Sequence, residues 1–232
     1  MSIQEGLRKI EKENYGLTRN DYVISEAWHY SQKNNVNIDG SPNMSYTNEW
    51  RRFNQCFISS GTAFVNKLID NLIKSGLEYR ASGRVDELAY LVRVGEFKSG
   101  DTVENNKRFF WDQHRKFINH VLAEAFPEAT PVPSVDYNKA GINSLDRLAY
   151  GILLERQPML GIHLGKEGGH IITAVGYRTN DLGKIIGLWV SDPAGVYTKG
   201  YSKDLDGFMS YLPEKVFPMI FRTDTHMMDL VR

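Results

Sequence analysis

A scarcity of cysteine is the first constraint that this sequence sets. Cys56 is the only cysteine among the 232 residues. A single thiol cannot build an intrachain disulfide framework, and it cannot supply the paired cysteines of a thiolate zinc site. Two interpretations of Cys56 remain open at this point. It is either a small buried apolar residue, as free cysteines often are, or a reactive thiol.

An excess of charge and long apolar runs are also missing. The 28 Lys and Arg residues balance the 28 Asp and Glu residues, so charge gives no reason to expect nucleic acid or an anionic membrane as a partner. No run approaches the roughly 18 apolar residues of a membrane span, and the charged N-terminus is unlike a signal peptide. We therefore expect a cytoplasmic protein, or one released without a signal peptide. Nothing resembles a phosphate-binding glycine loop, and we expect no cofactor and no metal.

Helical patterns occupy the first two thirds of the chain. Thr18 and Asp21 resemble a helix start, as cap and capping-box acid. Residues 31–49 are rich in Asn, Ser and Gly and predict a loop. Gly76 predicts the end of a central helix. Apolar residues recur at helical spacing over residues 1–14, 57–75, 84–94, 104–125 and 143–153.

The last third of the chain has the pattern of an antiparallel sheet. Residues 158–164, 170–177 and 185–192 are short β-prone runs separated by turn sequences. Further strands are expected around 195–201 and 215–221. Helices first and hairpin-linked strands second predict the α+β class rather than a parallel α/β fold.

Three residues in these elements could carry thiol chemistry. Cys56 stands where a polar loop turns into the central helix, and the positive end of a helix dipole stabilises a thiolate. His170 begins one predicted strand and Asp192 ends the next. A hairpin with its turn at 179–184 brings these two ends together, where a carboxylate would orient the imidazole. Taken singly, His170 also suits a core histidine and Asp192 a turn residue.

Four short segments, in this order along the chain, resemble the C39-like branch of the papain-like cysteine peptidases. They are Trp28–Asn35 with its Tyr-Ser-Gln, Gln55–Phe64 with the cysteine, Gly169–Tyr177 with Gly-His, and Val190–Pro193 with Asp-Pro. The resemblance implies a papain-like fold with the nucleophile helix packed on a C-terminal antiparallel sheet. It also implies Cys56 as nucleophile, His170 as general base, Asp192 as its orienter and Gln32 as oxyanion donor.

Departures from the family pattern leave other assignments open. Phe57-Ile58 replaces the usual Gly-Pro after the cysteine, and the stretch from Gln32 to Cys56 is long. Asn54 or Gln55 could then supply the oxyanion contact. We expect Trp28, Trp50, Gln55 and Gly169 to line the substrate site, although core packing would also explain the tryptophans. The predicted organisation is a single domain over 1–232, with a helical extension at 1–27 and a helical elaboration at 77–140.

The predicted function is hydrolysis of a peptide, isopeptide or cell-wall amide bond through an acyl-enzyme. The partner would be a peptide or protein, with peptidoglycan as one candidate. The setting could be an intracellular peptidase, or a phage, bacterial or toxin-borne hydrolase. Three alternatives stay open: an enzyme that passes the acyl group to an amine, as transglutaminases do, a degenerate papain-like domain that binds a peptide or protein, and a protein in which Cys56 is buried and inert.

Overall fold

The structure is a computed structural model, and seven strands of its described residues form one sheet that is accompanied by helices. It describes residues 17–30, 56–86, 90, 93–94, 97, 111–139, 145–164, 169–195, 207–221 and 226–231. The elements are β1 (Asp21–Val23), α3 (Cys56–Lys74), α5 (Trp111–Ala125), β2 (Val135–Lys139), α6 (Leu145–Leu153), β3 (Met159–His163), β4 (Gly169–Thr179), β5 (Ile185–Asp192), β6 (Gly207–Pro213), the 3₁₀ helix η5 (Glu214–Val216), α7 (Phe217–Ile220) and β7 (His226–Leu230).

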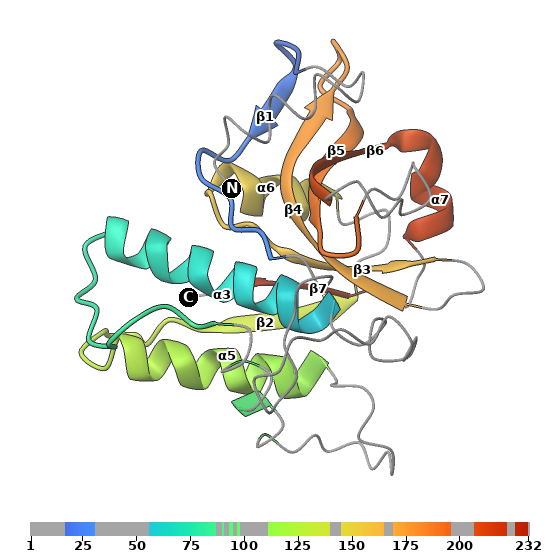
Figure 1. Ribbon diagram of the computed structural model, residues 1–232. Coiled ribbons are helices and arrows are strands. Elements are labelled where there is room, and N and C mark those ends of the chain that lie inside the picture. Colours follow the sequence, from blue (N-terminus) through green and yellow to red (C-terminus); the bar gives the residue numbers. More distant parts are fainter. Residues whose placement is uncertain are drawn as a thin grey trace.

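The long strand β4 organises the sheet, whose strand order is β2-β7-β3-β4-β5-β6 (Figure 1). The first half of β4 pairs with β3, its second half pairs with β1, and β5 lies along its other edge. All of these pairings are antiparallel. Gly176 is required where β1 crosses, because a Cβ atom there would lie 2.6 Å from the carbonyl oxygen of Tyr22.

The central helix α3 carries Cys56 as its first residue and ends at Lys74. Its C-terminus is closed by Gly76, which adopts a φ of 94°. The amide of Gly76 donates to the carbonyl of Ile73, and the amide of Leu77 donates to that of Leu72. These are the two hydrogen bonds of a Schellman motif, so the predicted end of this helix is confirmed.

Two hydrophobic cores hold the helices on the sheet. One lies between α3, α5 and the β2, β7, β3 and β4 strands, and it includes Phe64, Leu68, Phe117 and Met228. The other lies among β4, β5, β6, α6 and α7. Figure 1 shows α3 and α5 lying alongside each other, away from α6 and α7. In the first core α3 is buried on nearly all sides from Ile58 to Ile69, so the single apolar face that the sequence indicates understates its burial.

The predicted α+β class, with the cysteine helix packed on a C-terminal antiparallel sheet, is confirmed. The predicted strands 158–164, 170–177 and 185–192 correspond to β3, β4 and β5, and the helices predicted at 104–125 and 143–153 correspond in their described parts to α5 and α6. Among the described residues, no helix is both long and apolar enough to cross a membrane.

The predicted helix start at Thr18 is wrong. Thr18 and Asp21 do exchange local hydrogen bonds, but they close a turn that leads into β1. The Asp21 carboxylate also accepts hydrogen bonds from Arg178 and Trp189. These long-range contacts and the pairing of β1 with β4 override the local capping signal. The described part of the predicted 1–27 helical extension is therefore a turn, a strand and irregular backbone.

Two C-terminal predictions also need correction. The strand predicted at 215–221 is wrong, because residues 215–220 belong to η5 and α7. Pro218 explains this, because proline cannot donate to a ladder but fits the first turn of a helix. In the predicted 77–140 helical elaboration, β2 is a strand of the main sheet and pairs with β7. The predictions for 1–14 and 31–49 lie outside the described residues, as do all but the first residue of the strand predicted at 195–201. Of the helix predicted at 84–94, residues 84–86 are irregular, Tyr90, Arg93 and Val94 are helical, and the others lie outside the described residues.

Candidate active site

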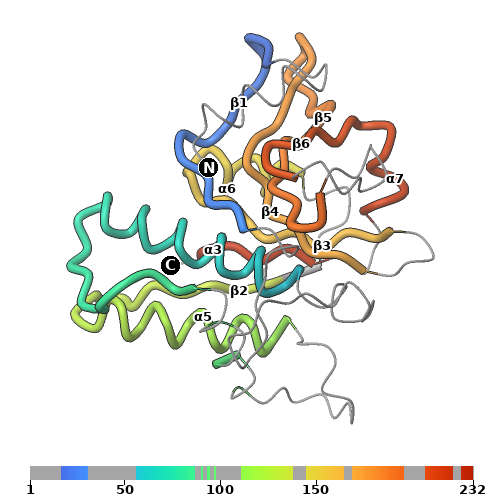
Figure 2. The backbone as a smooth tube through the Cα atoms, viewed as in Figure 1, coloured from blue at the N-terminus to red at the C-terminus, as the bar shows by residue number. Residues whose placement is uncertain are grey.

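The start of α3 is fixed against the strand that carries His170. Cys56 is the first helical residue and is only 3% exposed. One turn later, the Ser60 hydroxyl donates a hydrogen bond of 2.9 Å to the carbonyl of Ile171, the residue after His170. Both views place the N-terminal end of α3 next to the beginning of β4 (Figures 1 and 2). The thiol and the imidazole therefore come from two elements that are joined by a direct hydrogen bond.

His170 and Asp192 meet across the β4–β5 hairpin. His170 Nε2 lies 2.7 Å from Asp192 Oδ1, and both side chains are buried, with 5% and 1% of the residue exposed. The Ala194 amide donates to the same oxygen at 2.9 Å. On the other side, β6 packs closely because Gly207 has no side chain: a Cβ atom there would collide with the carbonyl oxygens of Asp192 and Gly195. The carboxylate is thus held from several directions.

Charge at the site favours the imidazolium form of His170. Burial alone would lower its pKa, but the Asp192 carboxylate and the Cys56 sulfur outweigh burial through charge and hydrogen bonding, and they raise the pKa to about 10. Since Asp192 occupies Nε2, Nδ1 is the nitrogen left to face Cys56. His170 therefore bridges the thiol and the carboxylate, and it is protonated at neutral pH.

The residue after the cysteine anchors the helix start to α5. Phe57 stacks on His114 with a ring-centroid distance of 4.0 Å and an interplanar angle of 10°, and it meets Trp111 edge-on at 5.1 Å. His114 Nδ1 lies 2.7 Å from the Tyr90 hydroxyl. Burial lowers the pKa of His114 to about 3, so this imidazole is neutral. The Phe57 ring thus packs the start of α3 against α5.

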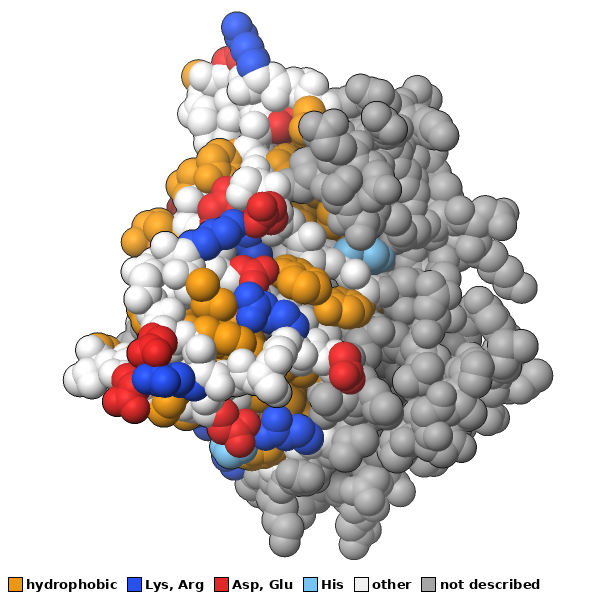
Figure 3. Space-filling view, turned by 60° about the vertical axis from the view of Figure 1, so that its left-hand side comes forward, with side chains coloured by type: hydrophobic (Ala, Val, Ile, Leu, Met, Phe, Trp, Pro, Cys, Tyr) orange, Lys and Arg blue, Asp and Glu red, His pale blue; other side chains and the backbone are white. Residues whose placement is uncertain are grey.

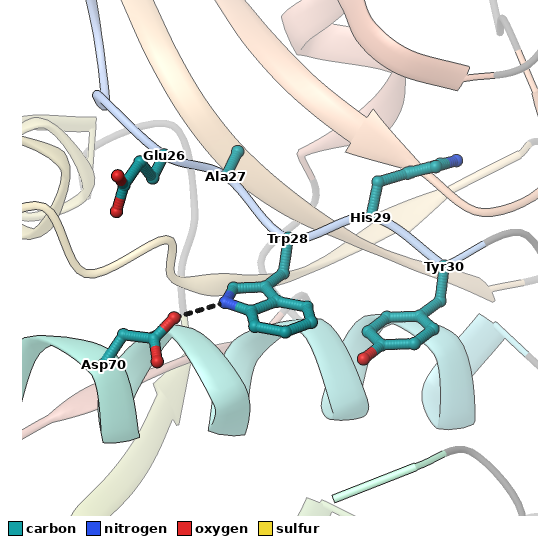
Figure 4. Close-up of a pocket in the computed structure, with 6 residues that line it drawn as sticks. All are labelled: Glu26, Ala27, Trp28, His29, Tyr30 and Asp70. Carbon is teal, nitrogen blue, oxygen red and sulfur yellow. Dashed lines mark hydrogen bonds between the residues drawn. The ribbon is translucent and has the colours of Figure 1, made fainter. Parts of the chain in front are cut away.

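A shallow groove of about 370 Å³ runs along the flank of α3 (Figure 4). Glu26–Tyr30 and Asp70 line it. The rings of Trp28 and Tyr30 are nearly parallel, with centroids 6.0 Å apart, and both lie over α3. Trp28 Nε1 donates to Asp70 at 2.7 Å, and the Tyr30 hydroxyl accepts from Asn66 at 3.0 Å. The groove therefore has a rigid aromatic floor.

The charges around this groove are paired. Glu26 forms an ion pair with Lys74, and Asp70 forms one with Arg84, each at 2.5 Å. Figure 3 shows the described part of this side of the molecule, where acidic and basic side chains are interspersed with apolar ones. The groove therefore offers aromatic surface and hydrogen-bonding groups more than net charge.

Comparison of the sequence with known proteins finds no match, whereas comparison of the structure does. The sequence matches no protein-family model and no curated protein. Among solved structures, the chain resembles UfSP from C. elegans, a cysteine protease, with a TM-score of 0.51 and 12% sequence identity over 94% of this chain. The fold is papain-like. At this identity the likeness concerns the fold, and the chain spans 35% of the length of the UfSP chain.

The papain-like fold brings together only some of the residues that the sequence singles out. Cys56, His170 and Asp192 form one cluster. Gly169 is exposed at the start of β4, next to His170, and Trp28 lies in the groove beside α3. Gln32, Trp50 and Gln55 lie outside the described residues. Within the described ranges, no three His, Cys, Asp or Glu side chains come together as metal ligands would.

Sequence reasoning missed two polar contacts made by Trp28 and its neighbour His29. His29 Nδ1 lies 2.6 Å from the hydroxyl of Ser191, the residue before Asp192. The side chain of Gln157 binds both backbone groups of Trp28. Each contact joins residues more than 120 positions apart, so no local spacing could have revealed it. The one available signal was a polar Gln157 separated by Pro158 alone from the start of β3.

Proposed function

We propose that this chain is a cysteine peptidase that hydrolyses an amide bond in a peptide or protein. The observation that carries the proposal is the bridging position of His170, between Cys56 at the start of α3 and the buried Asp192 carboxylate. A thiolate paired with an imidazolium is the nucleophile of thiol catalysis. The papain-like fold supports the proposal, because UfSP, which shares that fold, is a cysteine protease.

All three side chains act in both halves of the proposed reaction, which are acylation of the enzyme and hydrolysis of the acyl-enzyme. The Cys56 sulfur attacks the carbonyl carbon, and the imidazolium of His170 gives its proton to the leaving amine as the C–N bond breaks. The product is a thioester acyl-enzyme. Neutral His170 then takes a proton from water, which attacks the thioester and releases the acid with return of the thiol. Asp192 keeps the ring oriented through its hydrogen bond to Nε2.

The oxyanion would be stabilised at the start of α3. Helix geometry directs the first N–H groups outward without intrahelical partners, and the first turn of α3 contains no acidic residue to offset the positive end of its dipole. By the family resemblance, Gln32 adds a side-chain donor, with Asn54 or Gln55 as the alternative. The order of Gln32, Cys56, His170 and Asp192 along the chain also supports the C39-like branch.

Trp28 would contribute to substrate binding through the groove beside α3. Asn66 and Asp70, which hold the groove's two aromatic rings, are ten and fourteen residues beyond Cys56. At 1.5 Å per residue these positions are about 15 and 21 Å along the helix from the thiol. An extended peptide covers that span with about five or six residues. The groove would therefore contact substrate residues remote from the scissile bond, while Gly169, which precedes His170, would contact residues nearer to it. By the sequence prediction, Trp50 and Gln55 would also bind substrate.

Incubation with a proteome-derived peptide library in H₂¹⁸O tests the proposal. We expect new peptide termini that carry one ¹⁸O atom at the carboxyl group, because water releases the acyl-enzyme. The same termini should be absent with Cys56→Ala. Mass spectrometry with and without an added primary amine separates hydrolysis from acyl transfer, since transfer yields amides. Binding of peptides by both proteins without any cleavage would contradict the proposal and favour a binding module.

A further inference from the structure

Gln157 makes an unusual set of hydrogen bonds for a side chain that is 0% exposed. It lies between α6 and β3 and adopts a φ of 51°. Its Nε2 donates to the Trp28 carbonyl at 2.6 Å, and its Oε1 accepts from the Trp28 amide at 2.8 Å. Nε2 also donates to the hydroxyl of Thr173 in β4 at 2.9 Å. The side-chain amide thus pairs with Trp28 as a neighbouring strand would, and it ties that pair to β4.

This pairing fixes the direction of the side chains on either side of Trp28. When the N–H and C=O of one residue point to the same side, the backbone is extended and neighbouring side chains alternate. Trp28 and Tyr30 accordingly lie on one side, over α3, and His29 points away from them (Figure 4). The His29 ring lies at hydrogen-bonding distance from Ser191, the residue before Asp192. It also packs against Phe208 of β6, with the two ring centroids 5.4 Å apart.

We propose that Gln157 is a positioning residue for the active site. It holds the Trp28–Tyr30 segment against β4, so that the segment meets α3 on one side and the end of β5 on the other. Gln32, the oxyanion donor proposed above, follows Tyr30 by two residues. The inference rests on the proposed function and deepens it: a buried amide far from Cys56 in sequence sets the geometry for acyl chemistry without touching the substrate.

Two reagents applied to the only thiol of the chain separate this role from general packing. Iodoacetamide alkylates the sulfur by direct displacement and forms no oxyanion at a carbonyl. p-Nitrophenyl acetate acylates the sulfur through a tetrahedral oxyanion. With Gln157→Met, which keeps the side-chain length, we expect acylation to slow about tenfold or more while alkylation changes less than about twofold. Release of p-nitrophenolate follows the acylation, intact-protein mass follows the alkylation, and Cys56→Ala gives the background from other nucleophiles.

Asn119 offers a matched control for the loss of a side-chain amide that pairs with both backbone groups of a distant residue. Its Nδ2 donates to the Val135 carbonyl at 3.1 Å, and its Oδ1 accepts from the Val135 amide at 2.7 Å. This is the same two-bond arrangement, but it joins α5 to β2. Asn119→Leu should lower the melting temperature in the same direction as Gln157→Met and leave the ratio of acylation to alkylation unchanged.

Several results would overturn the inference. An unchanged ratio in folded Gln157→Met would do so, as would an equal change of the ratio in Asn119→Leu. If Gln157→Met does not fold, Thr173→Val removes only the bond to β4 and should lower the same ratio by a smaller factor; no change would refute the role. A wild-type protein that reacts with neither reagent would refute the proposed function, and the inference with it.

Discussion

Replacing Cys56 with serine lowers the rate of peptide hydrolysis about 10³-fold or more, by analogy with the loss seen when other hydrolases lose their nucleophile. The substitution is nearly isosteric, so the start of α3 keeps its hydrogen bond from Ser60 to Ile171. A hydroxyl, however, is far harder to ionise than a thiol. A His170 ring that is already protonated also cannot act as a base toward the serine hydroxyl. The measurement is kcat/KM on a peptide found in the library experiment.

Folding controls make that result interpretable. The melting temperature of Cys56→Ser should stay close to that of the wild type, because the volume and the surrounding core are preserved. Hydrolysis that remains within tenfold of the wild type would show that Cys56 is not the nucleophile. It would also return Cys56 to the other interpretation of the sequence, a buried and inert thiol.

Replacing Asp192 with alanine should reduce hydrolysis about 10²- to 10⁴-fold, as the loss of an orienting carboxylate does in related triads. The variant removes the acceptor of the bonds from His170 Nε2 and the Ala194 amide. Burial then dominates and lowers the pKa of His170. Asp192→Asn keeps an acceptor for the ring and should retain more activity than Asp192→Ala.

Asp229 provides the matched control for this substitution. It is another buried aspartate near a strand end, where burial raises its pKa to about 6 and Arg156 lies 3.7 Å away. It makes no contact with Cys56, His170 or Asp192 in the described structure. Asp229→Asn should leave kcat/KM within about twofold of the wild type, since it affects only a remote part of the core. Equal losses from Asp192→Asn and Asp229→Asn would contradict the orienting role.

Asp192→Ala should also change how the free energy of unfolding depends on pH. The pKa of His170 is raised in the folded protein to about 10, above the unfolded value of about 6.5. The stabilisation from this pair is therefore complete below about pH 6.5, and it is lost as the pH rises through about 10. In urea unfolding, the free energy of unfolding of the wild type should exceed that of Asp192→Ala most at pH 6. This difference should shrink toward pH 10.

Local patterns were sufficient where the contacts that decide the structure are local. The turn at 179–184 joins β4 to β5, and the antiparallel pairing of the two strands brings the start of β4, with His170, near the end of β5, with Asp192. The apolar spacing of α3 and the glycine at position 76 likewise determine that helix and its end. These are interactions over a few residues, or across one hairpin.

Contacts between distant segments account for what the sequence could not predict. Arg178 and Trp189 bind Asp21 and favour β1 over a helix. Phe57 stacks on His114, which comes 57 positions later in the chain. Gln157 forms its two hydrogen bonds with the backbone of Trp28, which is 129 residues away. Each partner is ordinary in its local sequence, and only the folded arrangement gives it a role.

The pH dependence of iodoacetamide alkylation tests the Cys56–His170 pair most directly. Because Cys56 is the only cysteine, each thiol alkylation event reports on it. The account predicts rapid alkylation that persists well below pH 8.5, the region where a free thiol titrates, and loss of this low-pH reactivity in His170→Ala. Slow alkylation that rises only near pH 8.5 and is unchanged in His170→Ala would contradict a thiolate–imidazolium pair and, with it, the assignment of this chain as a cysteine peptidase.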